Sequence, residues 1–330
     1  QAGILFTQFH TAPYCSPTRA MLLSGNNNHV AGIGRQGRSG ERPISQAPGY
    51  EGHLSSRIAP LPRLLRSAGY HTYTTGKWHL GVELEHSPWA AGFERSFNLV
   101  DGAGSHFSSV GFFEGGSLYR ENEREVSWPE GAYSPELYTD KLIEFIDADL
   151  DDDKPFFAFA AYTSPHWPLQ VPDDYLNRYV GHFDQGYDQL REARFASLRR
   201  AGIIPTDSKM PPRNDAITPW GKLSGEERKR ESRKMELYAA MVENLDAHVG
   251  RLIQHLERRG LKDNTLIVFM SDNGAAAGDF YNDRHLRFYD YVRAQYDNSS
   301  VEDFGREGSW VSYGAQWAEA GSAPFRYHKS

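Results

Sequence analysis

Short apolar runs and amphipathic stretches alternate along this chain. Residues 156–161 form a continuous apolar run, and residues 266–270 form a second one. Runs of this length without polar alternation are typical of buried strands in a parallel sheet. Residues 70–75, with alternating Tyr, His and Thr, also have the composition of a strand.

Between these runs lie stretches with helical periodicity. The longest begins at the capping-box pattern of residues 224–227, and its apolar positions recur with a 3.6-residue period until Gly260. Shorter helices are expected at 60–68, from Ser134 onwards and around 187–200. The alternation of helices and apolar strands predicts an α/β fold, a doubly wound and mostly parallel sheet with helices on both faces.

Other segments carry no steady period. We expect a single domain over residues 1–330, in which the proline-containing stretch 167–223 is a surface insertion. A long loop is expected at 24–56 and irregular structure at 86–133, while residues 279–330 are aromatic and polar with no strong period.

Cys15 is the only cysteine of the chain, and it stands where a helix is expected to begin. Pro17 suits a first helical turn, and Gly25 ends the run of helix formers. A side chain at position 15 would face the free N–H groups of this helix, which lower a thiol pKa and favour a bound anion. A lone cysteine is more often a small buried apolar residue, so position alone does not decide its role.

Polar residues follow each predicted strand. Lys77 and His79 come after the first, His166 after the second, and Asp272 with Asn273 after the third. Each has an ordinary structural explanation when taken singly, because buried histidines and Asp-Asn-Gly turns are common. The carboxyl ends of parallel strands meet at one edge of a sheet, so together these residues predict a polar site there.

Composition narrows the class of protein. A net charge of −7 gives no reason to expect nucleic-acid binding, and no apolar run approaches the ~20 residues of a membrane-spanning helix. One cysteine excludes an intrachain disulfide, so cysteine usage leaves the compartment open. The first residue, Gln1, suggests that the natural N-terminus lies elsewhere.

Five motifs resemble those of the sulfatase family, in the same order along the chain. Residues 15–19 match the signature C-x-P-x-R, and residues 69–79 resemble the second signature, G-Y-x-T-x-x-x-G-K-x-x-H. Residues 164–166 and 271–274 are similar to the middle histidine motif and the metal-binding D-N-G. Residues 323–329 resemble the segment that carries a distal lysine, most like that of bacterial arylsulfatases.

The resemblance implies an alkaline-phosphatase-like core and a sulfate ester hydrolase. Cys15 would be oxidised by a formylglycine-generating enzyme to Cα-formylglycine, whose hydrate attacks the sulfur of an aryl or other small sulfate ester. His79 would be the base, and His166 with Lys329 would hold sulfate oxygens and protonate the leaving group. Arg19, Lys77 and Lys329 would supply positive charge, and Asp272 and Asn273 would bind Ca²⁺ or Mg²⁺.

Two features depart from the family pattern. Members normally begin with a strand that ends in two aspartates, whereas the 14 residues before Cys15 contain no acidic residue. The smaller C-terminal domain after Lys329 is also absent, so the resemblance implies a chain that is incomplete at both ends. A phosphonate or phosphate monoester hydrolase of the same superfamily is the alternative, and a non-catalytic anion-binding fragment is a third reading.

Overall fold

The sheet at the centre of the molecule has five strands in the order β4-β3-β2-β1-β5. The structure is a computed structural model that describes residues 3–36, 47–112, 114–279 and 290–329. The strands are β1 (His71–Lys77), β2 (Arg95–Leu99), β3 (Tyr119–Glu121), β4 (Arg124–Glu125) and β5 (Phe156–Ala161).

Parallel pairing dominates the sheet. Strand β1 pairs in parallel with both β2 and β5, while β3 and β4 add an antiparallel edge. Gly76 of β1 has a φ of +91°, and a Cβ atom there would clash with the carbonyl of Ala161 on β5. Only glycine therefore lets β1 turn at this point while remaining paired with β5.

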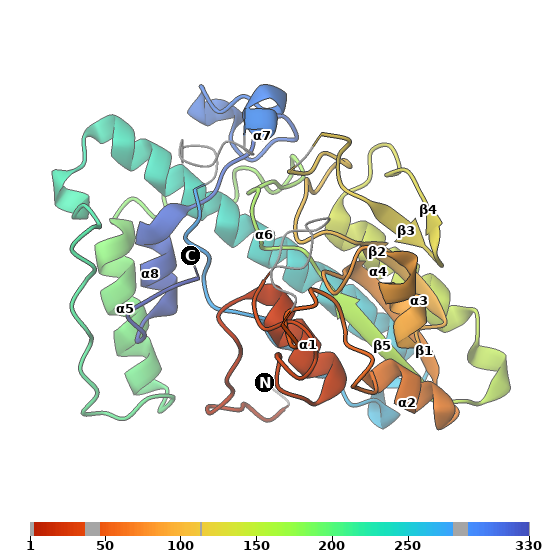
Figure 1. The fold of residues 1–330 in the computed structure, drawn as a ribbon. Coiled ribbons are helices and arrows are strands. Elements are labelled where there is room, and N and C mark those ends of the chain that lie inside the picture. The colour runs from red at the N-terminus through yellow and green to blue at the C-terminus, as the bar shows by residue number, and fades with distance from the viewer. Residues whose placement is uncertain (1–2, 37–46, 113, 280–289, 330) are drawn as a thin grey trace.

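Helices cover both faces of the sheet (Figure 1). Helix α4 (Ser134–Asp147) and the end of α6 (Gly225–Arg258) pack on one face, where Tyr73, Phe97 and Leu142 share a buried cluster. On the other face, Leu23 of α1 (Cys15–Ser24) and Ala91 of α3 (Pro88–Ala91) share a buried cluster with Trp78 and Phe93, and Phe157 and Phe159 of β5 pack against it. Helix α2 (Leu61–Ser67) leads into β1. The predicted α/β class with both faces covered is confirmed.

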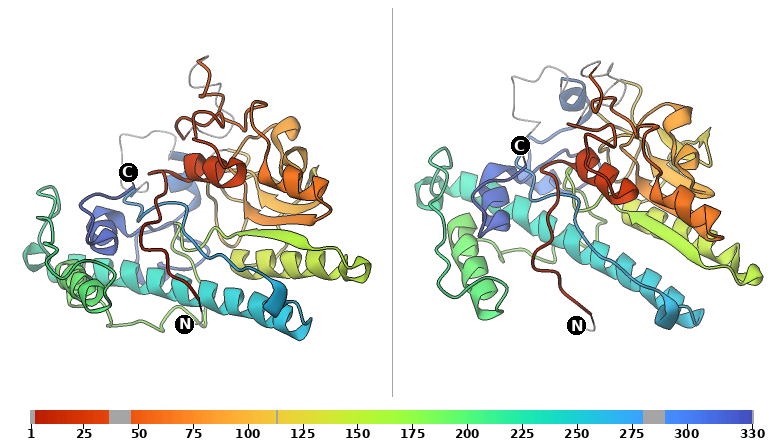
Figure 2. Two further views of the ribbon diagram at one scale, coloured as in Figure 1. Left: turned by 90° about the horizontal axis from the view of Figure 1, so that it is seen from below. Right: turned by 60° about the horizontal axis from the view of Figure 1, so that its bottom comes forward.

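Helix α6 extends beyond the sheet and supports a second cluster (Figure 2). There α5 (Gly186–Arg200) and α8 (Gly314–Ser322) pack together, with Trp220 and Trp317 among the buried side chains. Leu169, Val171 and Ile217 join the same cluster, so much of the segment 167–223 contributes to a packed core. Among the described residues the remaining helices are α7 (Asp290–Gln295) and the short 3-10 helices Leu84–His86, Leu150–Asp152, Trp220–Lys222, Lys262–Asn264 and Val301–Asp303.

Most predicted elements are present with small shifts at their ends. The strands expected at 70–75 and 156–161 are β1 and β5, and the capping box of Ser224 and Glu227 begins α6 as predicted. Gly25 ends α1 with a φ of 64°. The expectation of irregular structure over 86–133 was wrong in part, because β2, β3 and β4 lie there. These strands are short, and their place is set by pairing with distant residues more than by local pattern.

The strand predicted at 266–270 is not formed. Leu266, Val268 and Phe269 are 90%, 71% and 75% exposed, and no β pairing joins this segment to a described strand. An apolar run forms a strand only where a neighbouring strand pairs with its N–H and C=O groups. In the described sheet β5 is an edge strand, and the segment 266–270 does not pair with it. The residues that follow the run nevertheless reach the site described below.

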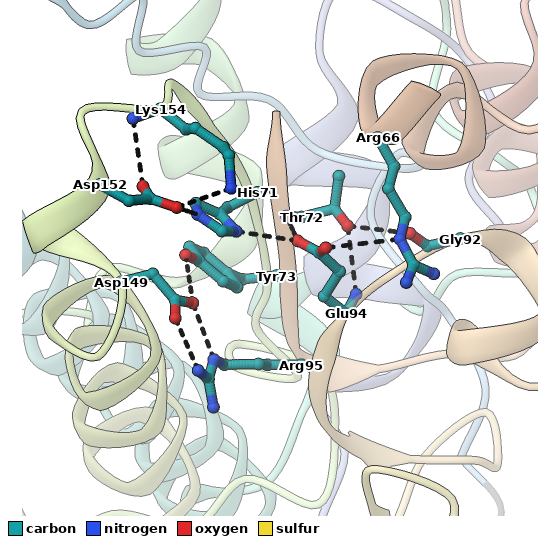
Figure 3. Close-up of polar contacts among 10 residues, drawn as sticks. All are labelled: Arg66, His71, Thr72, Tyr73, Gly92, Glu94, Arg95, Asp149, Asp152 and Lys154. Atoms are coloured by element: carbon teal, nitrogen blue, oxygen red, sulfur yellow. Dashed lines mark hydrogen bonds and ion pairs between the residues drawn. The ribbon is translucent and has the colours of Figure 1, made fainter. Parts of the chain in front are cut away.

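A cluster of charged residues surrounds His71, the first residue of β1 (Figure 3). The two ring nitrogens of His71 lie 3.1 Å from Glu94 Oε2 and 2.9 Å from Asp152 Oδ2. Only an imidazolium donates from both nitrogens. Burial alone lowers the pKa of His71, but the bonds to Asp152 and Glu94 outweigh it and the pKa is raised.

We predict that this cluster stabilises the fold most strongly at acid pH. A histidine whose folded pKa is raised contributes fully below its unfolded pKa, about 6.5, and loses that contribution as pH rises through the folded pKa. His71→Gln should therefore lower the free energy of unfolding more at about pH 5.5 than at about pH 8.5 in urea titrations. His10→Gln, at an exposed position ahead of α1, is the control and should show no such difference. An effect of His71→Gln that grows with pH would contradict the prediction.

None of the helices that the structure describes is both long and apolar enough to cross a membrane.

Candidate functional site

Cys15 lies buried at the first residue of α1, beside the last described residue of the chain. Lys329 Nζ donates a hydrogen bond to Cys15 Sγ at 2.8 Å, although the two residues are far apart in sequence. Figure 2 shows the C-terminal end returning toward α1. Burial raises the pKa of the Cys15 thiol, but Lys77 and Lys329 outweigh it, and the net shift is downward. The structure therefore favours an anion at this position.

Arg19 lies one turn further along α1 and is also buried. Its guanidinium donates to the carbonyl oxygens of Lys77 and, at 3.0 Å, Trp78, so α1 is fastened to the end of β1. The same side chain lies 3.7 Å from Asp272 Oδ2. The i, i+4 spacing of Cys15 and Arg19 thus places the thiol and the guanidinium on one face of the helix.

Strand β1 delivers Lys77 and His79 to the same place. Lys77 is the last residue of β1 and is buried; burial lowers its pKa, and its charge interacts with Cys15 and Asp272. His79 follows with a φ of 57°, an uncommon conformation for a residue with a side chain. Its Nδ1 is buried and has no hydrogen-bond partner. Burial and the cations Lys77, Arg19 and Lys329 hold the pKa of His79 well below 6.5, so the ring is neutral.

His166 follows β5 and faces the same cations. Its Nδ1 donates to the carbonyl of Trp167 at 2.8 Å, and its backbone N–H donates to Thr163. Burial, Lys329 and Lys77 hold its pKa well below 6.5. Because Nδ1 carries the proton, Nε2 is the basic nitrogen of the ring.

Asp272 and Asn273 stand at the carboxyl end of the exposed segment. Burial raises the pKa of Asp272, but Lys77, Arg19 and Lys329 lower it further, so the carboxylate is ionised. The next residues, 275–277, pair with Lys329: Lys329 N–H donates to the Ala275 carbonyl, and Ala277 N–H donates to the Lys329 carbonyl, both at 2.8 Å. This pairing holds Lys329 in place.

The donor types at Asp272 and Asn273 fit part of a hard-cation shell. Asn273 Oδ1 is buried and has no hydrogen-bond partner, and the Asp272 carboxylate offers two more oxygens. Ca²⁺ takes six to eight oxygens and Mg²⁺ six. Among the described residues no group of three or more His, Cys, Asp or Glu side chains could hold a metal ion, so Asp272 and Asn273 by themselves would supply only part of such a shell.

All eight residues predicted from the sequence thus lie at one end of the sheet. Those linked by hydrogen bonds, ion pairs or mutual charge effects are Cys15, Arg19, Lys77, His79, His166, Asp272 and Lys329; Asn273 adjoins them in the chain. Within this group three basic side chains, those of Arg19, Lys77 and Lys329, face one aspartate. In a protein of net charge −7, this concentration of positive charge points to an anionic ligand.

Comparison of the chain with known protein families identifies the family to which it belongs. The sequence profile of the family described as Sulfatase matches residues 1–305 of the chain. The chain belongs to the sulfatase family.

Two curated relatives support this assignment along the whole chain. An arylsulfatase of Klebsiella aerogenes is 38% identical over 337 residues, which cover 100% of this chain and 70% of the relative. An uncharacterised sulfatase of Schizosaccharomyces pombe is 39% identical over 345 residues, 99% of this chain and 61% of that protein. The chain therefore spans somewhat less than two thirds of the length of the S. pombe sulfatase.

Solved structures agree on the fold. The structure of Ps i-CgsB matches 80% of this chain and 49% of its own, with a TM-score of 0.54 and 24% sequence identity. Its complex with a neocarrahexaose gives a TM-score of 0.53. The sulfatase family acts on sulfate esters and generally uses Ca²⁺ and formylglycine.

Two residues beside the site were not found from the sequence of this sulfatase. His106 is fully buried and bonds to the backbone of His166, and Gly102 packs against the ring of His79. Both lie in the glycine- and serine-rich stretch after β2, for which the sequence predicted only irregular structure. No local signal marks either one, because their role depends on contacts with distant segments.

Proposed function

We propose that the protein hydrolyses sulfate esters at the site centred on Cys15. The observation that supports this most strongly is the contact between Lys329 and the buried Cys15, next to the buried side chains of Arg19 and Lys77. A monoanionic sulfate ester placed there would replace the Cys15 sulfur as the partner of these basic side chains. Preorganised cations of this kind stabilise charge on a transferring group more strongly in a buried site than in water.

The chain's own residues divide into three roles. Arg19 and Lys77 hold and orient the sulfate group, because both are buried and fixed to the sheet end. His79, neutral and with an unpartnered Nδ1, is placed to take a proton at that nitrogen. Lys329 and His166 face the leaving-group side, and an arriving anion raises the pKa of His166. Formylglycine formed at position 15 supplies the nucleophile of the family.

Asp272 and Asn273 are proposed as ligands of a divalent cation. Calcium fits better than zinc because both side chains offer hard oxygen atoms. The cation would add positive charge for the sulfate oxygens. A sulfatase-maturing enzyme that converts Cys15 is the partner this proposal requires.

A comparison of leaving-group esters tests the reaction class. The purified enzyme, co-expressed with a maturing enzyme, is assayed with 4-nitrophenyl sulfate, 4-nitrophenyl phosphate and a 4-nitrophenyl phosphonate. We expect kcat/KM to be highest for the sulfate, by about 10-fold or more, because the chain belongs to the sulfatase family. A higher kcat/KM for the phosphonate would assign the protein to phosphonate hydrolysis instead.

A further inference from the structure

The loop that follows β2 contacts both histidines of the proposed site. Strand β2 ends at Leu99, and the carbonyl of Val100 accepts a hydrogen bond of 3.1 Å from the His79 N–H. Two residues on, Gly102 lies against the imidazole of His79. At the far end of the loop, His106 reaches the segment that carries His166.

The donor and the acceptor can be assigned in each hydrogen bond of the His106 ring. Its Nε2 lies 3.0 Å from the carbonyl oxygen of His166, which can only accept, so Nε2 carries the proton. Its Nδ1 lies 2.7 Å from Ser134 Oγ and therefore accepts from that hydroxyl. Burial lowers the pKa of His106 to about 4, so the ring is neutral at neutral pH and this tautomer persists.

The chain of bonds continues to the start of the same segment. Thr163 Oγ1 lies 3.2 Å from Ser134 Oγ, whose proton already goes to His106, so Thr163 donates to Ser134. The backbone N–H of His106 donates to Gln170 Oε1 at 2.9 Å. His106 is 1% exposed. A buried imidazole thus links residues before, within and after the His166 turn, with each polar atom satisfied.

Gly102 sets the position of the His79 ring because the two residues lie very close together. A Cβ atom at this residue would lie 2.7 Å from Cε1 and 2.9 Å from Nε2 of His79. Contacts under 3.0 Å do not occur between such atoms, so an alanine at 102 forces the ring or the loop to move. The φ of Gly102 is not positive, so the requirement for glycine here comes from space alone.

We propose that residues 100–106 are a positioning element for both histidines, acting on His79 through Gly102 and on His166 through His106. Gly102 and His106 do not themselves take part in the reaction. The proposal rests on the proposed function for the roles of His79 and His166. Displacement of a catalytic group by about 1 Å can lower a rate ~10²-fold, so small shifts of these rings have large consequences.

The first test does not depend on activity. In protein with unmodified Cys15, ring resonances of His166 and His79 are followed by NMR against pH, in wild type, His106→Ala, Gly102→Ala and Gly250→Ala. We expect His106→Ala to shift the His166 signals and raise its apparent pKa as water enters, and Gly102→Ala to shift those of His79. Gly250, with nothing within 4 Å of its would-be Cβ, is the control and should change neither. Unchanged histidine resonances in His106→Ala and Gly102→Ala would overturn the proposal.

The second test is a double-mutant cycle on sulfate turnover. His106→Ala should lower kcat by about 10-fold or more with a smaller change in KM, and should lower it no further in a His166→Ala background. His106→Gln, which can donate to the His166 carbonyl, should restore part of the loss. Full additivity of His106→Ala and His166→Ala would contradict the proposal. If His166→Ala by itself leaves kcat unchanged, the role of His166 is wrong while the NMR result still stands.

Discussion

Replacing Cys15 with serine should stop the enzyme after at most one turnover. A serine hydroxyl at position 15 can accept the sulfuryl group, but it lacks the second oxygen that lets the family's modified residue release sulfate. We expect steady-state turnover of 4-nitrophenyl sulfate to fall by about 10⁴-fold or more, which is within the range measured when a nucleophile is removed. The measurement is product released per active site, in which the serine variant should not exceed one equivalent.

Ser16→Ala is the matched control for this substitution. Ser16 is buried next to Cys15, and its hydroxyl has no hydrogen-bond partner, so its removal leaves no group unsatisfied. Its kcat should stay within a few-fold of wild type. Repeated turnovers by Cys15→Ser would show that release of sulfate does not need the modified residue.

Replacing Asp272 with asparagine should affect both stability and activity. Asp272 is the carboxylate that faces Arg19, Lys77 and Lys329, and Arg19 and Lys77 are buried. Removing one member of such a buried group leaves charge uncompensated and destabilises by roughly 3 kcal/mol. Loss of a negative ligand should also weaken Ca²⁺ binding and lower kcat by about 10²-fold or more.

The contribution of Asp272 to the free energy of unfolding should decrease as the pH falls. The folded pKa of Asp272 is lowered, so its contribution to stability is present above the unfolded pKa, about 3.9, and is lost as pH falls through the folded pKa. Urea unfolding of wild type and Asp272→Asn should therefore differ most at neutral pH and converge in acid. Glu302→Gln, in an exposed pair with Lys229, is the control and should leave the midpoint unchanged. A difference that grows in acid would contradict the proposed charge arrangement.

The elements that the sequence predicted well are those whose pattern is local. Helix α6 has a capping box and a long apolar stripe, and β5 is a continuous apolar run, so neither depends on knowledge of its partners. The segment 266–270 has the same kind of pattern and yet is not a strand, because pairing needs a neighbour that its own residues cannot specify. Strands β2 and β3 illustrate the reverse: their polar sequences become strands because β1 supplies the pairing for β2, and β2 supplies it for β3.

The residues of the site also differ in whether a local sequence pattern was enough to place them. Cys15 and Arg19 share one helix, and Lys77 and His79 share one strand end, so short motifs were enough to associate each pair. Lys329 could be placed only through the family resemblance, since nothing near it in sequence points to Cys15. His106 and Gly102 are ordinary residues in sequence, and only the folded chain brings them against the two histidines.

The state of Cys15 in active enzyme tests the central claim most directly. Peptides that contain residue 15 are analysed by mass spectrometry, from preparations whose turnover of 4-nitrophenyl sulfate has been measured. We expect the aldehyde of formylglycine, recognised by its lower mass and its reaction with a hydrazine, in a fraction that rises in proportion to kcat per total protein. A preparation with full sulfatase activity in which residue 15 is entirely an unmodified thiol would contradict the account.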